Sequence, residues 1–315
     1  MTGAEKRSND LKRICVIGSM NVDCILKLAR FHQPGETILA ESMTSSPGGK
    51  GGNQAVAAAK LGVPVRMVGM LGTDDNGRLY ERTLRENGVD LSLVQVLTET
   101  PSGLAIIEVD ARGENRIIVV AGANMALTPA YIDEVLPQLL EDDIFLFQLE
   151  SPIDTVCHAA KLLHAHGKTV VLDPAPAAPL PDALLACVDY LTPNRTELSV
   201  LSGMEVQTDE EVLTAAKSLL ARGSGAVIAK LGGGGCLYID PATVLRVPGF
   251  HVDTIDTTAA GDSFNAGFAA ALSLGQNTAQ ALRFANAVGA LSTTGSGAQG
   301  AMPSRAEAER LFTQP

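Results

Sequence analysis

The segment DTTAAGDSFNAGF, residues 256–268, places two alanines, a glycine and an aspartate at the predicted start of a long apolar helix. Ala259, Ala260 and Gly261 carry no side chain that would keep an anion away from the main chain. The free amides and the dipole at a helix N-terminus both favour negative charge. This segment therefore predicts an anion site, and a phosphate group is the anion that suits it.

Asp262 stands directly beside this predicted anion site, where its carboxylate can accept a proton from an alcohol. With an ordinary pKa of about 3.9 it is a weak base toward a hydroxyl. A weak base suffices in a loose phosphoryl-transfer transition state, because the alcohol loses its proton late and orientation matters more. The segment alone leaves two compatible interpretations open, a helix cap and a catalytic base.

A cluster of glycines, PGGKGGN at residues 47–53, is the second candidate binding element. Glycines adopt backbone angles closed to other residues and let a ligand approach the main chain. The cluster opens a predicted helix over residues 53–61, whose first amides are free for polar or negative partners. A flexible loop with Asn53 as the helix cap is the alternative interpretation.

Asn21 and Asp23 follow the first predicted strand and lie on one face if that segment is extended. In parallel sheets, ligands bind beyond the carboxyl ends of the strands. Two oxygen-bearing side chains at such a place suit the hydroxyls of a sugar. A turn would explain the pair equally well.

The composition limits the class of protein. The chain has 315 residues, 46% of them hydrophobic, enough for one large α/β domain or two ordinary ones. Its net charge of −11 argues against nucleic acid and anionic membranes as partners. Five cysteines without a Cys-x-x-Cys pair favour a reduced, cytoplasmic protein. Residues 1–10 read as a flexible polar tail without a secretory signal, and no segment suits a membrane span.

Strands and helices alternate along most of the chain, which predicts an α/β fold with a central, mostly parallel sheet covered by helices on both faces. The predicted strands are residues 14–18, 65–70, 144–148, 169–172, 190–192 and 226–231, and the predicted helices are 53–61, 77–87, 129–139, 153–166, 197–202 and 209–221. Four further segments are predicted to be extended with no helix between them: 23–28, 36–43, 104–109 and 116–120. We expect these to form a small β-layer beside the main sheet.

The motifs GGKGGN at 48–53 and DTTAAGD at 256–262 together resemble the ribokinase family of sugar kinases, over residues from about 13 to 310. The resemblance implies ATP-dependent phosphorylation of D-ribose at its 5-hydroxyl, with Mg²⁺ and K⁺ as cofactors. It also implies an α/β domain made of residues 11–22, 48–101 and 123–315. Residues 23–47 and 102–122 would form a β-lid over the sugar, through which two copies pair as a homodimer.

The same resemblance assigns roles to individual residues. It implies that Asp262 is the catalytic base and that Gly261 and Ala260 belong to the anion hole. The residues implied to hold the sugar are Asn21, Asp23, Gly49, Lys50, Gly51, Gly52, Asn53, Glu150 and Asp262. Those implied to bind the nucleotide are Asn194, Glu197, Lys230, Leu231, Gly232, Gly233, Gly234, Gly235, Gly261 and Asn286, with Asn194 and Glu197 near the phosphates and magnesium. A monovalent-cation site is implied at Asp256, Thr258, Ser292, Gly295, Gly297 and Ala301, largely through carbonyls.

The nucleotide loop KLGGGG, residues 230–235, departs from the family pattern, which usually has threonine in place of Lys230 and a Ser-Arg-like pair within the loop. Four glycines keep the backbone accessible to ATP but remove a side-chain contact. Lys230 either pairs with a phosphate or points away from it. The departure bears on nucleotide affinity and leaves the class of reaction unchanged.

Three alternatives to a ribose kinase stay open at this level. The first is a kinase of the same fold that acts on 2-deoxyribose, a ketohexose or a nucleoside. The second is a sugar-sensing protein that kept the pocket and lost catalysis, against which Asp262 and Gly261 argue. The third is a hydrolase built on Ser263, with His251 as the only histidine nearby in sequence.

Overall fold

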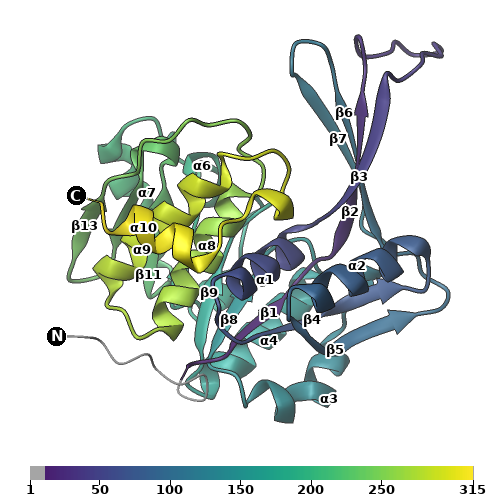
Figure 1. The fold of residues 1–315 in the computed structure, drawn as a ribbon. Coiled ribbons are helices and arrows are strands. Elements are labelled where there is room, and N and C mark those ends of the chain that lie inside the picture. The colour runs from purple at the N-terminus through teal and green to yellow at the C-terminus, as the bar shows by residue number, and fades with distance from the viewer. Residues whose placement is uncertain (1–10, 315) are drawn as a thin grey trace.

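The computed structural model describes residues 11–314, so the predicted tail at residues 1–10 lies outside the described part. A nine-stranded sheet with helices on both faces forms the main body, and a separate four-stranded sheet projects from it (Figure 1). The large sheet has the order β13-β12-β11-β10-β9-β8-β1-β4-β5. Its neighbours are parallel except at one edge, where β11–β12 and β12–β13 are antiparallel. The predicted fold class is therefore confirmed.

The strands of the large sheet are short and mostly buried. Their bounds are β1 Ile14–Ile17, β4 Val65–Gly72, β5 Asp90–Leu97, β8 Ile144–Phe147, β9 Thr169–Leu172, β10 Tyr190–Leu191, β11 Ala226–Lys230, β12 Cys236–Ile239 and β13 Val244–Val247. In β1, Ile14 and Val16 belong to the hydrophobic core on one face of the sheet, and Cys15 and Ile17 belong to the core on the other. A strand covered on both faces reads as a continuous apolar run, which is why the sequence revealed it.

The helices divide between these two cores. One face is covered by α1 Lys50–Lys60, α2 Asp75–Glu86, α8 Ala260–Ser273, α9 Thr278–Ser292 and α10 Arg305–Phe312. The other is covered by α3 Pro129–Leu139, α4 Ile153–Ala165, α5 Asp182–Leu185, α6 Arg195–Ser202 and α7 Asp209–Ala221. Three short 3₁₀ turns complete the described elements: η2 Gly122–Ala126, η3 Gly232–Gly234 and η4 Gln299–Ala301. Among the described helices, none has both the length and the apolar character that crossing a bilayer requires.

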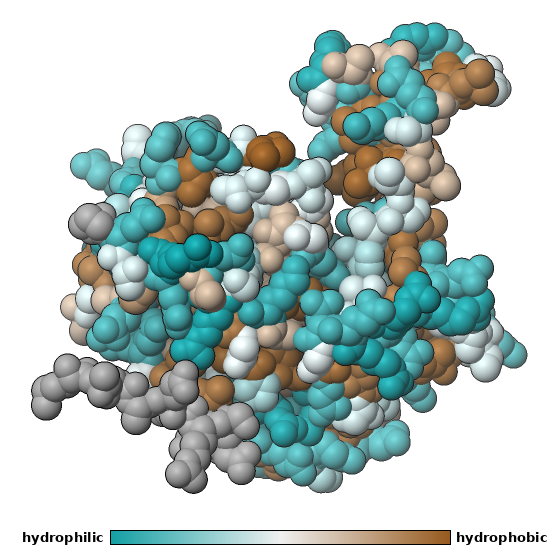
Figure 2. All heavy atoms as spheres, viewed as in Figure 1, coloured by the Kyte–Doolittle hydropathy of each residue, from teal (hydrophilic) through white to brown (hydrophobic). Residues whose placement is uncertain are grey.

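The small sheet is built from two excursions of the chain and has the order β3-β2-β6-β7. Its strands are β2 Asn21–Lys27, β3 Ser42–Gly48, β6 Gly103–Val109 and β7 Asn115–Val120. It stands away from the body and carries hydrophobic residues on its surface (Figures 1 and 2). Every residue of β7 is exposed, including Ile117, Ile118, Val119 and Val120. Exposed apolar strands are typical of interaction surfaces in proteins.

Most predicted strands and helices are confirmed, with shifts of a few residues at their ends, but the extended segment predicted at 36–43 is wrong. The strand here is β3, which begins at Ser42, and most of residues 28–41 form an irregular loop. Pairing decides the position, because Gly48 is fixed opposite Asn21 and the register then runs back to Ser42 opposite Lys27. The strands β5, β12 and β13 were not predicted at all.

The helix predicted to begin at Asn53 begins at Lys50, with Gly49 as its N-cap. Gly51 and Gly52 therefore lie inside the helix, although glycine disfavours helices. A Cβ on Gly51 would lie 2.6 Å from the Ser19 nitrogen, and one on Gly52 would lie 1.8 Å from the Tyr80 hydroxyl. Close packing of this turn outweighs the helix propensity.

A buried charge cluster surrounds Arg66 at the amino ends of the parallel strands. Its Nε donates to Asp90 Oδ2 at 3.1 Å and its Nη1 to Asp142 Oδ2 at 3.1 Å. The Arg66 side chain is 6% exposed and that of Asp142 is fully buried. Removing one partner of a buried ion pair leaves an uncompensated charge.

Replacing Arg66 with methionine should therefore lower the free energy of unfolding by about 3–5 kcal/mol at pH 8, measured by urea unfolding. Burial raises the pKa of Asp142 to about 6, although Arg66 and Arg13 lower it. The loss should shrink at about pH 5, because the carboxyl without its arginine takes up a proton and no longer needs a cation.

Arg85→Met is the matched control, because Arg85 forms an exposed pair with Glu81 one helical turn away. Its loss should be about 0.5 kcal/mol or less. Equal losses at the two arginines would contradict the assignment of Arg66 as a structural cation.

Candidate active site

Residues that follow the carboxyl ends of the parallel strands meet the first turns of α1 and α8. These two helices pack against each other on one face of the sheet. Because parallel strands all end at the same edge, segments far apart in the sequence converge here. Most of the residues expected to bind sugar, phosphate or nucleotide are found at this edge.

Asp262 lies in the first turn of α8 and is 5% exposed. Its Oδ2 accepts a hydrogen bond from Asn53 Nδ2 at 3.0 Å, and its Oδ1 accepts one from Gln54 Nε2 at 3.3 Å. Both donors belong to α1. The N-cap of α8 is Ala259, without a side-chain capping bond, so the Asp262 carboxylate is held by a neighbouring helix and forms no cap.

The start of α8 has the backbone form of an anion site. Ala259 has a left-handed φ of 59°, which is costly for a residue other than glycine. The Ala260 amide donates to the Thr257 carbonyl at 3.2 Å. Within residues 11–314, the amides of Gly261 and Asp262 have no hydrogen-bond partner. Two adjacent free amides at the N-terminus of a long helix suit a phosphate oxygen.

Burial raises the pKa of Asp262 to about 6. The Lys50 ammonium and the hydrogen bond from Asn53 oppose this shift, whereas the charges of Asp173 and Glu150 add to it. A carboxylate with a pKa near 6 is a stronger base than an ordinary aspartate and remains ionised at neutral pH.

Asn21 and Asp23 lie on β2, where the small sheet joins the body. Asn21 Oδ1 accepts from Asn124 Nδ2 at 2.7 Å, and Asn21 Nδ2 is 3.5 Å from Glu150 Oε2. Burial, together with the charges of Glu150 and Asp262, raises the pKa of Asp23 to about 6. These carboxylates therefore lie near enough to influence one another.

Two glycines let the sugar-side groups approach the backbone of β3. A Cβ on Gly48 would lie 2.1 Å from Asp23 Oδ2, and one on Gly49 would lie 2.6 Å from the Asn21 nitrogen. Gly49 also has a left-handed φ of 78°. Glu150 Oε2 accepts from the Lys50 amide at 3.1 Å. The glycine cluster thus holds Asn21, Asp23 and Glu150 around one end of α1.

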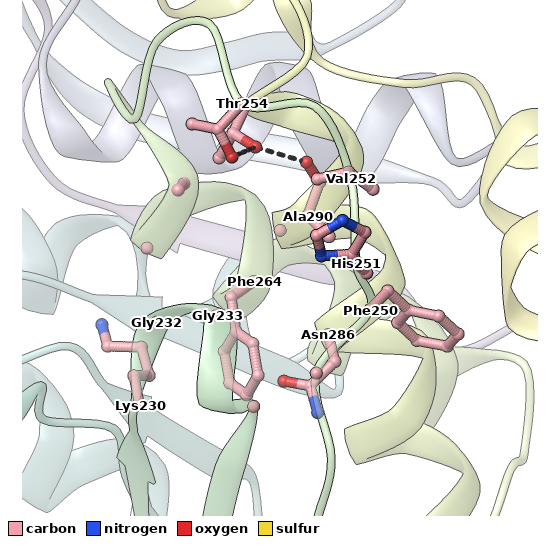
Figure 3. Close-up of a pocket in the computed structure, with 16 residues that line it drawn as sticks. Lys230, Gly232, Gly233, Phe250, His251, Val252, Thr254, Phe264, Asn286 and Ala290 are labelled. Atoms are coloured by element: carbon pink, nitrogen blue, oxygen red, sulfur yellow. Dashed lines mark hydrogen bonds between the residues drawn. The ribbon is translucent and has the colours of Figure 1, made fainter.

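A cavity of about 450 Å³ lies on the other side of the start of α8 (Figure 3). Phe250, His251 and Asn286 are on one side of it and Lys230 on the other, with Phe264 between them. Gly232, Gly233, Gly235 and Gly261 also line it. Leu231 and Gly234 are not among its lining residues, and Leu231 packs against the hydrophobic core. An apolar end and a cationic end suit a nucleotide.

A smaller cavity of about 320 Å³ adjoins the first, and Lys230, Gly232, Ala260 and Gly261 line both. The polar side chains that line it are Lys50, Asp173, Asn194, Glu197, Lys230, Thr257 and Asp262. Lys50, which we expected beside the sugar, thus directs its side chain to this cavity. Burial acts to lower the pKa of Lys50, but the surrounding carboxylates outweigh it and raise the pKa: Asp262, Asp173, Glu150 and Glu197.

Asn194 and Glu197 form a capping box at the start of α6. Asn194 Oδ1 accepts from the Glu197 amide, and Glu197 Oε2 accepts from the Asn194 amide, both at 2.8 Å. The capping box fixes the Glu197 carboxylate at the wall of the smaller cavity. This local motif explains why the two residues are three apart.

Two loops meet around Asp256. Its Oδ1 accepts from the Thr258 hydroxyl at 2.7 Å, and its Oδ2 accepts from the Gly297 amide at 2.9 Å. Desolvation opposes these bonds, yet they lower the pKa of Asp256. Gly295 approaches Ala301, and Ser292 ends α9 just before this turn. The six residues expected to form a cation site thus lie on adjoining segments. Among the described residues, no three His, Cys, Asp or Glu side chains form a metal cluster.

Sequence reasoning missed several polar residues of the site. Asp173 follows β9 directly, and the rule that drew attention to Asn21 and Asp23 would have found it. Gln54 adjoins Asn53 and accepts from Gln148 Nε2 at 2.7 Å. Gln299 donates to Asn53 Oδ1 at 3.2 Å and to the Tyr80 hydroxyl at 3.0 Å. Nothing in the sequence around Gln299 indicates this contact.

The hydrolase alternative fails on geometry. The Ser263 hydroxyl is fully buried and has no hydrogen-bond partner within residues 11–314. His251 lines the larger cavity and forms no hydrogen bond with the Ser263 hydroxyl. A serine nucleophile requires a histidine within hydrogen-bond reach.

The fold and this site together have the form of a sugar kinase. A model described as pfkB family carbohydrate kinase matches residues 11–305, and the chain belongs to this family. It is 42% identical to a ribokinase of Bacillus subtilis (strain 168), with 96% of this chain and 100% of the relative covered. It is 38% identical to a deoxyribokinase of Salmonella typhi, with 92% and 95% covered. The solved structure of Arabidopsis thaliana ribokinase complexed with ribose and ATP matches with a TM-score of 0.93 at 35% identity, covering 97% of this chain and 100% of that one.

Replacing Asp262 with asparagine should lower kcat by roughly two to four decades, the usual contribution of a general base, while sugar affinity changes little. In the wild type, kcat/KM should rise as the pH increases through about 6, because the base must lose its proton. Steady-state rates across this pH range check both. A variant that keeps more than about a tenth of wild-type kcat would show that Asp262 is not the base.

Potassium should raise the rate, and sodium or lithium should do so poorly. The Gly297 amide donates to Asp256 and so joins the two loops. We propose that carbonyls of both loops bind a large cation, which would order the segment that leads into α8. The measurement compares rates in potassium, sodium and a bulky organic cation at matched ionic strength. Equal rates in potassium and in the organic cation would rule the site out.

Proposed function

We propose that this protein transfers the terminal phosphoryl group of ATP to the 5-hydroxyl of D-ribose, giving D-ribose 5-phosphate and ADP. The observation that carries this proposal is the position of Asp262. Its buried carboxylate and the free amides beside it separate a set of sugar-binding groups from a cavity of nucleotide size. The likeness to ribokinases over nearly the whole chain supports the same activity.

In the proposed reaction, the oxygen of the 5-hydroxyl bonds to the terminal phosphorus while Asp262 accepts the proton of that hydroxyl. The bond between that phosphorus and the bridging oxygen breaks, and ADP leaves with the electron pair. The amides of Gly261 and Asp262 hold the oxygens of the transferring group. Charge stabilisation and positioning therefore supply most of the rate enhancement, as is usual in phosphoryl transfer.

The sugar is held by Asn21, Asp23, Gly49, Asn53 and Glu150 in this proposal. Support comes from their grouping around the amino end of α1, where Asn53 binds both Asp262 and Gln299. Hydroxyl-rich ligands need several donors and acceptors fixed in place, because each unpaired buried group weakens binding. The network supplies both kinds.

Magnesium and potassium are the proposed cofactors. Asn194 and Glu197 would hold magnesium together with the nucleotide phosphates, and their oxygens are the ligands that this ion prefers. Magnesium usually keeps several waters and takes only one or two carboxylates from the protein, so a single carboxylate from Glu197 fits this ion. Bound magnesium neutralises phosphate charge. Potassium is assigned to the six residues around Asp256.

Residues 23–47 and 102–122 are proposed to act as the lid over the sugar and as the surface that pairs two copies in a homodimer. The support is the small sheet, which carries Asp23 at its base and the exposed apolar strand β7 at its edge. A cytoplasmic location is proposed because all five cysteines are unpaired.

A second candidate substrate is 2-deoxyribose, and the similarity to a deoxyribokinase is the observation that favours it. The deciding experiment measures ADP release with ribose, 2-deoxyribose, a ketohexose and a nucleoside, and locates the phosphate on the product by phosphorus NMR. Release that depends on ribose, with the phosphate on the 5-oxygen, supports the proposal. No release with any of these sugars would favour a sensing protein.

Ribose should be preferred to 2-deoxyribose on the order of ten- to a few hundredfold in kcat/KM. The reason is that Asp23, in the proposed complex, accepts hydrogen bonds from the 2- and 3-hydroxyls. An unsatisfied buried partner costs about 1–3 kcal/mol, and more when it is charged. Steady-state kinetics with both sugars, in the wild type and in Asp23→Asn, test the effect and its cause.

Comparing the two sugars tests the substrate preference, and comparing the wild type with Asp23→Asn tests its cause. Equal or reversed preference in the wild type would point to deoxyribose or another substrate. An unchanged ratio in Asp23→Asn would show that the selectivity, though present, does not come from Asp23.

A further inference from the structure

A buried ion pair lies at the junction of the two cavities. Lys230 is the last residue of β11, and its Nζ donates to Asp173 Oδ1 at 2.8 Å. The Lys230 side chain is 12% exposed and that of Asp173 is 3% exposed. Asp173 follows β9, so the pair links the ends of two strands of the large sheet. A close pair this well shielded from solvent interacts more strongly than one on the surface.

The Lys230 ammonium also lies beside the candidate phosphate site. A Cβ on Gly261 would lie 3.4 Å from Lys230 Nζ, and the amide of Gly261 is one of the two free amides of α8. Lys230 lines both cavities, at the end of the larger one opposite Phe250 and His251 (Figure 3). A nucleotide whose base occupies the apolar end would bring its phosphates to this ammonium.

The region around the two cavities has more carboxylates than lysines, so the partner of Lys230 affects how a phosphate can bind. Five carboxylates gather around this region: Asp23, Glu150, Asp173, Glu197 and Asp262. Lys50 and Lys230 are the cations that face them among the described residues. A triphosphate that binds here needs positive charge. Of the two lysines, Lys230 is already paired with Asp173.

We propose that Asp173 competes with the nucleotide phosphates for Lys230, so that nucleotide binding breaks the Lys230–Asp173 pair and transfers the ammonium to the phosphates. This inference rests on the proposed function and adds a residue, Asp173, that regulates nucleotide affinity. The long, flexible lysine side chain allows the exchange, because its ammonium is a point charge without a fixed hydrogen-bond geometry.

The release of Lys230 from Asp173 would also affect Asp262, the proposed base. Gln54 Nε2 donates at 3.3 Å to Asp173 Oδ2 and also at 3.3 Å to Asp262 Oδ1, so one amide joins the two carboxylates. When Lys230 leaves, the charge of Asp173 is no longer balanced and acts on Asp262. Like charges nearby make a carboxylate hold a proton more tightly. Nucleotide binding would thereby strengthen Asp262 as a base.

The test measures binding by calorimetry without sugar, using a non-hydrolysable ATP analogue and adenosine. The proteins are the wild type, Lys230→Met, Asp173→Asn and the double variant. Lys230→Met should weaken the analogue by about tenfold or more and leave adenosine within about threefold, because adenosine has no phosphate. Asp173→Asn should tighten the analogue by about three- to tenfold, since Lys230 no longer has to leave a carboxylate.

In the double variant the effect of Asp173→Asn should disappear, because no lysine remains to be released. Equal weakening of the analogue and adenosine in Lys230→Met would overturn the proposal and leave Lys230 a structural residue. So would weaker analogue binding in Asp173→Asn, or a gain that persists in the double variant.

Failure of the proposed function would look different. It would appear as a wild-type protein that binds the analogue but releases no ADP with any sugar. Wild-type protein that binds no nucleotide would overturn both proposals.

Discussion

The burial of a negative charge at the junction of α1 and α8 is the constraint on which the site depends. Asp262 is nearly inaccessible and has acidic neighbours, so an ionised carboxylate survives there only with compensation. Asn53 and Gln54 supply hydrogen bonds from the facing helix, and Lys50 supplies charge. The first turns of α1 therefore hold Asp262, the proposed base, in place and also carry groups proposed to bind the sugar. Its glycines follow from the same constraint, because the turn must approach Ser19 and Tyr80 closely.

Hydrogen bonds connect the site to segments far away along the chain. Gln299 belongs to η4, beyond the loops around Asp256, and it bonds both Asn53 and Tyr80. Lys60 at the far end of α1 donates to the Gln299 carbonyl at 2.6 Å. The segment proposed to bind potassium is thus joined by hydrogen bonds to α1, the helix that orients Asp262. A cation that orders this segment would act on Asp262 from two directions, through α8 and through Asn53.

The two sheets differ in how they are covered: the large sheet forms the main body, and the small sheet projects from it (Figure 1). The large sheet is covered on both faces, and its strand ends fix Glu150, Asp173, Asn194 and Lys230 at one edge. The small sheet has no second layer and presents an exposed apolar strand. Asp23 stands where the two meet. A carboxylate at this junction can respond to a sugar that arrives from solvent, whereas Asp262 behind it remains shielded.

The sequence by itself determined the α/β fold, because buried strands and amphipathic helices differ in period and length, as the runs at 14–18 and 209–221 illustrate. Its two motifs, around Lys50 and before Asp262, also indicated the reaction class through their resemblance to sugar kinases, whereas the residues alone predicted only an anion site and a polar binding site. Only the tertiary structure decided where α1 begins, which residues pair with β2, and where the Lys50 side chain points. It alone revealed the contacts of Gln54 and Gln299, since Gln54 lies 208 residues from Asp262 and Gln299 lies 246 residues from Asn53 along the chain. Hydrogen bonds and charge pairs between segments so far apart depend on how the strands order themselves in the sheet, and a local pattern of residues carries no record of that order.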